Sequence, residues 1–124
     1  MPKSNIFRSK ADNFKLPMFF PDATRAFIRT VDATDIENTK TKGILVNTYH
    51  LYKDLGMSVV TKFGGIRNFM GWKGMVISDS GGFQVMSLVK KGGGKGKVDD
   101  RGVTFKPIGE KKMLLTPEDS IKFQ

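Results

Sequence analysis

The residues from Asp79 to Gln84 read Asp-Ser-Gly-Gly-Phe-Gln and bring together the side chains of this chain that are best suited to chemistry. They directly follow Met75-Val76-Ile77, an apolar run that is typical of a buried strand. In α/β proteins, ligands bind and reactions take place where such a strand gives way to a turn. Asp79 can accept or donate a proton there, and Ser80 adds a small hydrogen-bonding group.

The residues that follow complete a surface for a flat ligand. Gly81 and Gly82 let the backbone approach a ligand closely and adopt conformations closed to other residues. Phe83 offers an apolar face that can stack on a planar group. The set suits a polar-edged heterocycle such as a nucleobase. A second interpretation stays open: a tight turn in which Asp79 caps backbone amides, because turns of this composition are common.

Two apolar runs predict the strands that position this segment. Residues 43–46, Gly-Ile-Leu-Val, and residues 74–78, Gly-Met-Val-Ile-Ser, indicate strands buried on both faces. Between them, residues 48–55 predict a helix that is closed by Gly56. A strand, a crossover and a second strand make a βαβ unit, whose two strands are parallel.

The ends of these two strands bring polar side chains to one face. Asn47 ends the first strand and Asp79 ends the second. Because parallel neighbours end at the same edge of a sheet, the amide can hold the carboxylate in a fixed orientation through hydrogen bonding. We interpret His50, the sole histidine, as a structural residue, since no Gly-x-Ser-x-Gly elbow supplies it with a nucleophile. Trp72 could stack on a base, but we expect it to pack in the core.

The amino-terminal third predicts simpler elements. Residues 1–15 are polar and basic and indicate an arm or an irregular strand. Residues 16–20 are apolar, and Pro17 among them indicates an edge strand or the start of a strand. Residues 35–40 predict a short helix.

The carboxyl-terminal residues predict a hairpin and the start of a helix. Residues 103–105 and 113–115 would pair around a turn at 107–109. Thr116-Pro117-Glu118-Asp119 is a good helix start, with Thr as the N-cap, Pro at the first helical position and an acid three residues after the cap. The sequence ends after roughly two turns of this helix, which is too short to be stable alone.

Residues 90–97, Lys-Lys-Gly-Gly-Gly-Lys-Gly-Lys, predict a flexible basic loop. The spacing is not that of a P-loop, because no Ser or Thr follows the last lysine. One interpretation is that Lys90, Lys91, Lys95 and Lys97 contact RNA phosphates. The other is a solvated insertion between a turn and a hairpin.

The composition limits the partners of the chain. Lys and Arg number 21 against 12 Asp and Glu, a net charge of +9, which favours binding to polyanions such as nucleic acid over an ordinary basic protein. Because the chain contains no cysteine and one histidine, we expect no disulfide, no metal and no cofactor on this chain. No apolar run approaches the roughly 18 residues that span a bilayer, and the first residues lack the apolar stretch of a signal peptide. We therefore expect no membrane association and a cytoplasmic location.

Several separate motifs together resemble the tRNA-guanine transglycosylases, also called queuine tRNA-ribosyltransferases. They come in that family's order and at compatible spacings, from about residue 16 to the last residue. The segments that carry the resemblance are Leu-Val-Asn-Thr-Tyr-His-Leu at 45–51, Phe-Met-Gly-Trp at 69–72, Ser-Asp-Ser-Gly-Gly-Phe-Gln-Val-Met-Ser-Leu at 78–88, Gly-Val-Thr-Phe-Lys at 102–106 and Leu-Thr-Pro-Glu at 115–118.

This resemblance implies a fold and also a missing part. Members of the family are (β/α)8 TIM barrels, and such a barrel takes about 250 residues, whereas this chain has 124. We therefore expect an α/β fold in which residues 1–124 are a single incomplete domain, the N-terminal portion of a TIM barrel preceded by a short N-terminal β segment. We interpret the chain as a fragment, from a truncated gene, an incomplete reading frame or a split protein.

The resemblance also implies a reaction and residue roles. Members exchange a guanine at the anticodon wobble position of tRNA for a 7-deazaguanine, queuine or its precursor, through an aspartate that attacks the ribose. Asp79 matches a second aspartate, which accepts and donates protons and contacts the base. The segment Ser80–Phe83 matches the base-binding residues, with Phe83 as the stacking partner. Asn47 and Thr48 match residues that hold the aspartate of the motif.

Parts of the family pattern match nothing in this sequence. The nucleophilic aspartate and the Cys/His zinc site are implied to lie beyond Gln124, and the intact enzymes are implied to be dimers. Three classes of function follow. The first is a pentosyltransferase fragment that acts on tRNA and a guanine-type base but is inactive alone. The second is a non-catalytic basic RNA-binding remnant, and the third is a non-functional truncation product.

Overall fold

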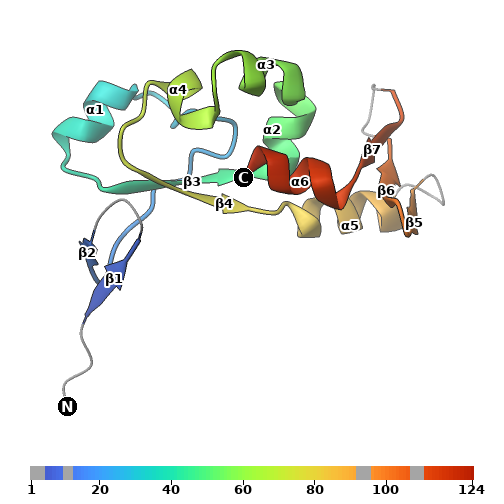
Figure 1. Ribbon diagram of the computed structural model, residues 1–124, viewed down its shortest axis with the longest axis horizontal. Helices are drawn as coiled ribbons and strands as arrows, with labels where there is room; N and C mark the ends of the chain where they lie inside the picture. Colours follow the sequence, from blue (N-terminus) through green and yellow to red (C-terminus); the bar gives the residue numbers. More distant parts are fainter. Residues whose placement is uncertain (1–4, 10–12, 92–95, 107–110) are drawn as a thin grey trace.

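The computed structural model describes residues 5–9, 13–91, 96–106 and 111–124. Within these residues the chain is a mixed α/β protein with three small sheets. In the view of Figure 1, helices α1 to α4 lie along one side of the central pair of strands, and the hairpin β1–β2 lies on the other side. Helices α5 and α6 and the strands β5 to β7 follow at the far end of that pair.

The central unit is a parallel strand pair joined by a helical crossover. Strand β3 (Gly43–Asn47) pairs in parallel with β4 (Met75–Asp79), and Asn47 lies opposite Asp79 in the register. The crossover contains α2 (Thr48–Asp54), α3 (Gly56–Lys62) and α4 (Ile66–Met70). The predicted βαβ unit with parallel strands is thus confirmed.

The two strands differ in burial, which corrects one expectation. Strand β3 is almost fully buried, because a chain segment pairs with it on its second side: Ala23 N donates to Leu45 O at 2.7 Å. Strand β4 was expected to be buried on both faces, yet Ile77 is 40% exposed. Among the described residues β4 pairs only with β3, so one of its edges and part of one face lack cover.

The main core lies between the strand pair and the crossover helices. Ile44, Leu51, Val60 and Trp72 are among its buried members. The indole of Trp72 is 3% exposed, and its Nε1 donates to Met75 O at 3.0 Å. The expected core position of Trp72 is therefore confirmed, and its one polar atom is satisfied in the way that buried indoles require.

A second core forms where the chain leaves β4. Helix α5 (Gly82–Lys91) packs against an antiparallel sheet of β5 (Lys97–Asp99), β6 (Gly102–Phe105) and β7 (Met113–Leu115). Its buried members are Tyr49, Val85, Phe105 and Leu115. The predicted hairpin of β6 and β7 is confirmed, while its turn at 107–109 lies outside the described residues. Strand β5 was not predicted.

Helix α6 (Pro117–Phe123) connects the two cores. Thr116 Oγ1 accepts a hydrogen bond from Asp119 N at 3.0 Å, and Asp119 Oδ2 accepts one from Thr116 N at 3.5 Å, so the predicted capping box is present. At the other end Phe123 is 4% exposed and meets the ring of Tyr52 edge-on at 5.5 Å. Tertiary packing of this kind stabilises a helix that is too short to persist alone.

The amino-terminal residues bear out some expectations and correct one. Strands β1 (Ile6–Arg8) and β2 (Asn13–Lys15) form an antiparallel hairpin, and α1 (Ala33–Asn38) begins at a capping box of Asp32 and Asp35. Residues 16–20 were expected to form a strand and do not. One reason is Pro17, because proline has no backbone N–H to donate in a strand ladder. Every helix in the described residues is too short or too polar to cross a lipid bilayer.

Candidate functional site

The carboxylate of Asp79 is held from two sides at the carboxyl end of β4. Asn47 Nδ2 donates to Asp79 Oδ2 at 2.7 Å, and Gly81 N donates to Asp79 Oδ1 at 3.2 Å. Asp79 itself remains exposed. Both interpretations of the motif are therefore present in the geometry. One oxygen caps a backbone amide, while the other is oriented by the neighbouring strand and stays within reach of a ligand.

Asn47 is the residue that connects the elements around this carboxylate. It is 5% exposed and serves as the N-cap of α2, because its Oδ1 accepts from His50 N at 3.3 Å. Its Nδ2 also reaches Gln84 Oε1 at 3.4 Å, a long contact. The amide thus ties β3, β4, α2 and α5 together. Gln84 belongs to the motif, but its residue type did not lead us to predict this contact.

Thr48 supports the site one residue away from the aspartate. Its hydroxyl is fully buried and lies 2.9 Å from Ser78 Oγ, and it also accepts from Gln124 Nε2 at 3.4 Å. The resemblance implied that Thr48 holds the aspartate of the motif. The contact is made through Ser78, the residue before Asp79, so Thr48 fixes the end of β4 and does not touch the carboxylate by a hydrogen bond.

Gly81 has a backbone position that no other residue fits. Its φ is +74°, and a Cβ built on it would lie 2.4 Å from Tyr49 Cβ and 2.8 Å from Tyr49 N. Gly82 is different, since its added Cβ would meet only Ser80 Oγ at 3.5 Å. The first glycine therefore lets the turn pack on α2 and aim its N–H at Asp79.

The remaining motif side chains face solvent. Ser80 is exposed, and its Oγ accepts from Gly82 N at 3.4 Å. Phe83 is the second residue of α5 and is 75% exposed. A large apolar ring that is left this open offers a stacking surface for a planar ligand.

The structure divides the four lysines that were expected to share one basic loop. Lys90 and Lys91 belong to the last turn of α5, and Lys97 begins β5, so these three lysines lie in a helix or a strand and not in the predicted loop at 90–97. Lys95 lies outside the described residues. Lys97 Nζ lies 3.4 Å from Asp99 Oδ2, and Arg101 pairs with the same carboxylate at 3.0 Å. Asp99 therefore offsets part of the positive charge at this end.

His50 lies close to the site but has a different character. Its Nδ1 is buried without a hydrogen-bond partner among the described residues, and its ring meets Tyr49 edge-on at 5.0 Å. Burial lowers the pKa of His50 below its ordinary value of 6.5, and the positive charge of Arg25 lowers it further. The imidazole is thus neutral at pH 7, in line with its interpretation as a structural residue.

Two hollows flank the sheet, and they differ in their relation to Asp79. A cleft of about 510 Å³ borders the motif at Ser80 and Gly82 and is walled by α5, the β5–β7 sheet and the start of α6. A larger cavity of about 850 Å³ lies at the opposite, amino-terminal ends of β3 and β4, where Lys42 and Met75 line it. Of the motif, only Ser80 and Gly82 line the smaller cleft, and no motif residue lines the larger cavity.

The residues of this chain do not fit the zinc that the resemblance implies. There is no cysteine and one histidine, and in the described part of the chain no three His, Cys, Asp or Glu side chains gather as a metal site would require. No step at this site is therefore assigned to zinc.

Comparison with known proteins places the chain in a family. The family model described as queuine tRNA-ribosyltransferase matches residues 4–124. The queuine tRNA-ribosyltransferase of Thermotoga neapolitana is 41% identical over 111 residues, which cover 89% of this chain and 29% of that protein. The protein of the same name from a Nostoc species is 38% identical over 123 residues, covering 98% of this chain and 32% of that protein.

The chain belongs to the queuine tRNA-ribosyltransferase family. This identification confirms the resemblance carried by the motifs. The chain spans about a third or less of the length of the curated relatives it matches. Its match with the Staphylococcus epidermidis relative shows the same proportion, with 38% identity over 96% of this chain and 31% of that protein.

The two adjacent glycines provide a matched test of the turn geometry. Gly81→Ala is expected to lower the free energy of unfolding, because left-handed backbone strain costs about 1–3 kcal/mol and overpacking against Tyr49 adds about 1–3 kcal/mol. Gly82→Ala is the control and should change it by less than about 1 kcal/mol. Urea denaturation of both variants measures the difference. Equal effects of the two substitutions would contradict this account of Gly81.

The sole histidine allows a clean test of pH dependence. Because the pKa of His50 is lowered in the folded chain, the unfolded chain takes up the proton first as the pH falls below about 6.5. The free energy of unfolding should therefore decrease as the pH falls through this window, and His50→Gln should remove that part of the decrease. NMR titration of the ring protons gives the folded pKa directly. A midpoint at or above 6.5 would show that burial does not control this side chain.

Proposed function

We propose that this chain is the amino-terminal part of a tRNA-guanine transglycosylase, in which Asp79 is the proton-transfer residue for the exchanged base. The observation that carries this proposal is the 2.7 Å hydrogen bond from Asn47 Nδ2 to Asp79 Oδ2 across the ends of two parallel strands. This hydrogen bond orients the carboxylate of Asp79, and the side chain stays exposed. A residue that acts as general acid and base needs both properties. Family membership supports the substrate class of tRNA and a guanine-type base.

The proposed fold of the complete protein is a (β/α)8 barrel whose first strands are present here. Strand β3 is flanked on both sides, whereas β4 has an edge without a partner among the described residues. An unpaired strand edge presents N–H and C=O groups that native sheets pair or cover, so a further parallel strand beside β4 would complete the local pattern. The carboxyl ends of the strands, where Asp79 lies, are the active face of such barrels.

In this mechanism the residues of the chain handle the base and its proton. Phe83 stacks on the ring of the extruded base, and the turn from Ser80 to Gly82 brings backbone groups to its edge. A nucleophile from the rest of the barrel attacks the ribose carbon, and the bond from that carbon to guanine breaks while the protonated carboxyl of Asp79 gives its proton to guanine. The incoming base then attacks the same carbon and releases the nucleophile, and the Asp79 carboxylate takes up the proton that this base loses. Asn47 keeps the carboxylate aimed throughout.

A non-catalytic role in RNA binding is the second candidate. The net charge of +9 and the exposed Lys90 and Lys97 favour it. Both candidates predict contact with RNA phosphates, and only the first predicts an essential Asp79.

The role of Asp79 can be tested in a chimera that joins residues 1–124 to the part of the Thermotoga neapolitana relative beyond its aligned region. The chimera should incorporate labelled guanine into unmodified tRNA, and the isolated chain should not. Asp79→Asn keeps size and shape but removes the proton acceptor, so the rate should fall by about 10²–10⁴. Phe83→Ala should mainly raise KM, because a lost stack weakens binding by about 1–3 kcal/mol.

Matched controls separate these roles from general damage. Asp100→Asn removes the same charge from an exposed turn residue, and Phe27→Ala removes an exposed ring outside the motif. Both should leave kcat and KM near the parent values. Turnover within a few-fold of the parent in Asp79→Asn, with complete loss in Phe83→Ala, would reverse the proposed assignments and make Asp79 a turn cap.

Binding of tRNA by the isolated chain tests the lysines near α5 and β5. Affinity should fall steeply with salt, because each neutralised phosphate contributes about 0.7–0.9 to the slope of log K against log salt. Replacing Lys90, Lys91, Lys95 and Lys97 with Gln should lower both affinity and slope. A charge-matched variant with Gln at Lys15, Lys62, Lys106 and Lys112 serves as the control. An unchanged slope in the first variant would assign the segment to a solvated insertion.

A further inference from the structure

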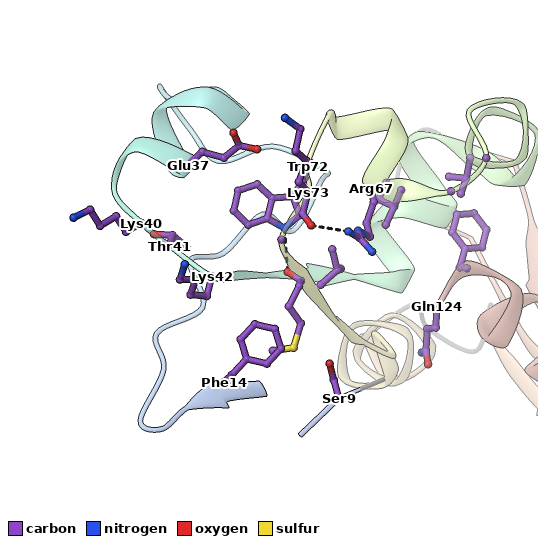
Figure 2. A pocket seen from close by; sticks show the side chains of 18 of the residues that line it. Ser9, Phe14, Glu37, Lys40, Thr41, Lys42, Arg67, Trp72, Lys73 and Gln124 are labelled. Atoms are coloured by element: carbon purple, nitrogen blue, oxygen red, sulfur yellow. Dashed lines mark hydrogen bonds between the residues drawn. The ribbon is translucent and has the colours of Figure 1, made fainter. Parts of the chain in front are cut away.

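The larger cavity, of about 850 Å³, is drawn in Figure 2, and none of the motif residues 79–84 lines it. It is lined where β3 and β4 begin, by Lys42, Gly74 and Met75, whereas Asp79 ends β4. At about 3.3 Å per residue, four residues of strand separate Met75 from Asp79 by about 13 Å. On another side the cavity reaches Gln124, whose Nε2 donates to Thr48 Oγ1 at 3.4 Å, so it borders the buried support of that site without including the motif.

The rim of the cavity is strongly positive. Five cationic residues line it against one acid, Glu37. They come from the loops before the two strands, from α4 and from α6, and they are Lys40, Lys42, Arg67, Lys73 and Lys122. Among the described residues none of the five takes part in an ion pair. Figure 2 labels Lys40, Lys42 and Lys73 among the lining residues, and the ammonium end of Lys40 points away from the other side chains.

The floor of the cavity is apolar and rigid. Trp72 lies in it, fixed by the hydrogen bond of its Nε1 to Met75 O. Val60, Val76 and Phe123 line it as well. Gly74 allows the indole to pack this closely, because a Cβ there would lie 2.3 Å from the ring and 2.8 Å from Lys42 O.

One of the cations is already held in place. Arg67 Nη2 donates to Lys73 O at 2.6 Å, which the dashed line in Figure 2 marks. A guanidinium has five N–H donors in a planar fork, so this bond positions Arg67 and leaves other donors for a ligand. A fixed fork next to mobile ammonium groups is the combination that favours phosphate oxygens.

We propose that this cavity binds a phosphate-bearing ligand with a planar ring, of the nucleotide class, through Arg67 and the lysines of its rim. The volume lies within the range of about 300–1,000 Å³ that is usual for small-molecule sites. The positive rim takes the phosphate, and the apolar floor around Trp72 takes the ring. A free nucleotide and a terminal phosphate of RNA share this chemistry. The site is independent of the proposed transglycosylase function.

Trp72 makes the test specific, because it is the one tryptophan of the chain. The full 124-residue chain is titrated with GMP, pyrophosphate, guanosine and a 5′-phosphorylated single-stranded RNA, and indole fluorescence is followed. GMP should change the emission in a saturable way, and guanosine, which lacks phosphate, should bind at least about tenfold more weakly, as expected for lost charge-assisted hydrogen bonds. Binding of pyrophosphate alone would identify the phosphate as sufficient. Comparison of GMP with RNA distinguishes the two sources.

Two charge-matched variants complete the experiment. Lys40→Gln, Lys42→Gln and Lys73→Gln together should weaken GMP binding by about tenfold or more. Lys106→Gln, Lys111→Gln and Lys112→Gln remove the same three charges from residues that do not line the cavity, and GMP binding should stay within about threefold of the parent. Far-ultraviolet circular dichroism verifies that both variants fold. Absence of saturable binding by every phosphate probe, or equal loss in both variants, would overturn the proposal.

Discussion

The hydrogen bond between Asn47 and Asp79 is the interaction on which the rest of the site depends. It requires that β3 and β4 run in parallel and in register, since these two residues face each other as the last pair of the ladder. It also requires that α2 begins at Asn47, because the other end of the same amide caps that helix. One buried side chain thus fixes a strand pair, a helix start and the direction of a carboxylate. A buried amide with its partners satisfied gives this rigidity without placing an unpaired charge in the core.

Around this contact the chain uses close backbone packing to hold the turn. The left-handed Gly81 lies against Tyr49, and Tyr49 in turn packs against Phe105 of the second core, with ring centroids 5.6 Å apart. The β5–β7 sheet, which is far from Asp79 in sequence, therefore supports the turn through one aromatic residue of α2. Support of this kind holds the carboxylate of Asp79 in a fixed geometry while leaving it exposed.

Much of the fold could be predicted from the sequence because its signals are local. Short apolar runs indicated β3 and β4, and the capping box at Thr116 indicated α6. The pairing of Asn47 with Asp79 followed from the geometry of parallel strands. By contrast, the exposure of Ile77 depends on which segments lie beside β4, and a local sequence pattern does not predict those neighbours. Strand β5 is three residues long, and Lys97 and Asp99 on either side of Val98 disfavour a strand, so its pairing with β6 was not visible from composition. Gln84 and the cavity around Trp72 emerge only when distant segments meet.

The sequence separation within the central pair has a consequence for how the protein folds. Asn47 and Asp79 are 32 residues apart along the chain, so the oriented carboxylate cannot form until the whole crossover has closed. Closing a loop of that length costs conformational entropy before the contact can repay it, and such non-local contacts slow folding. Helices α2 and α3 are seven residues long each, which is too short for stability in isolation, so they depend on the same closure. We therefore expect the crossover helices and the oriented carboxylate to form together.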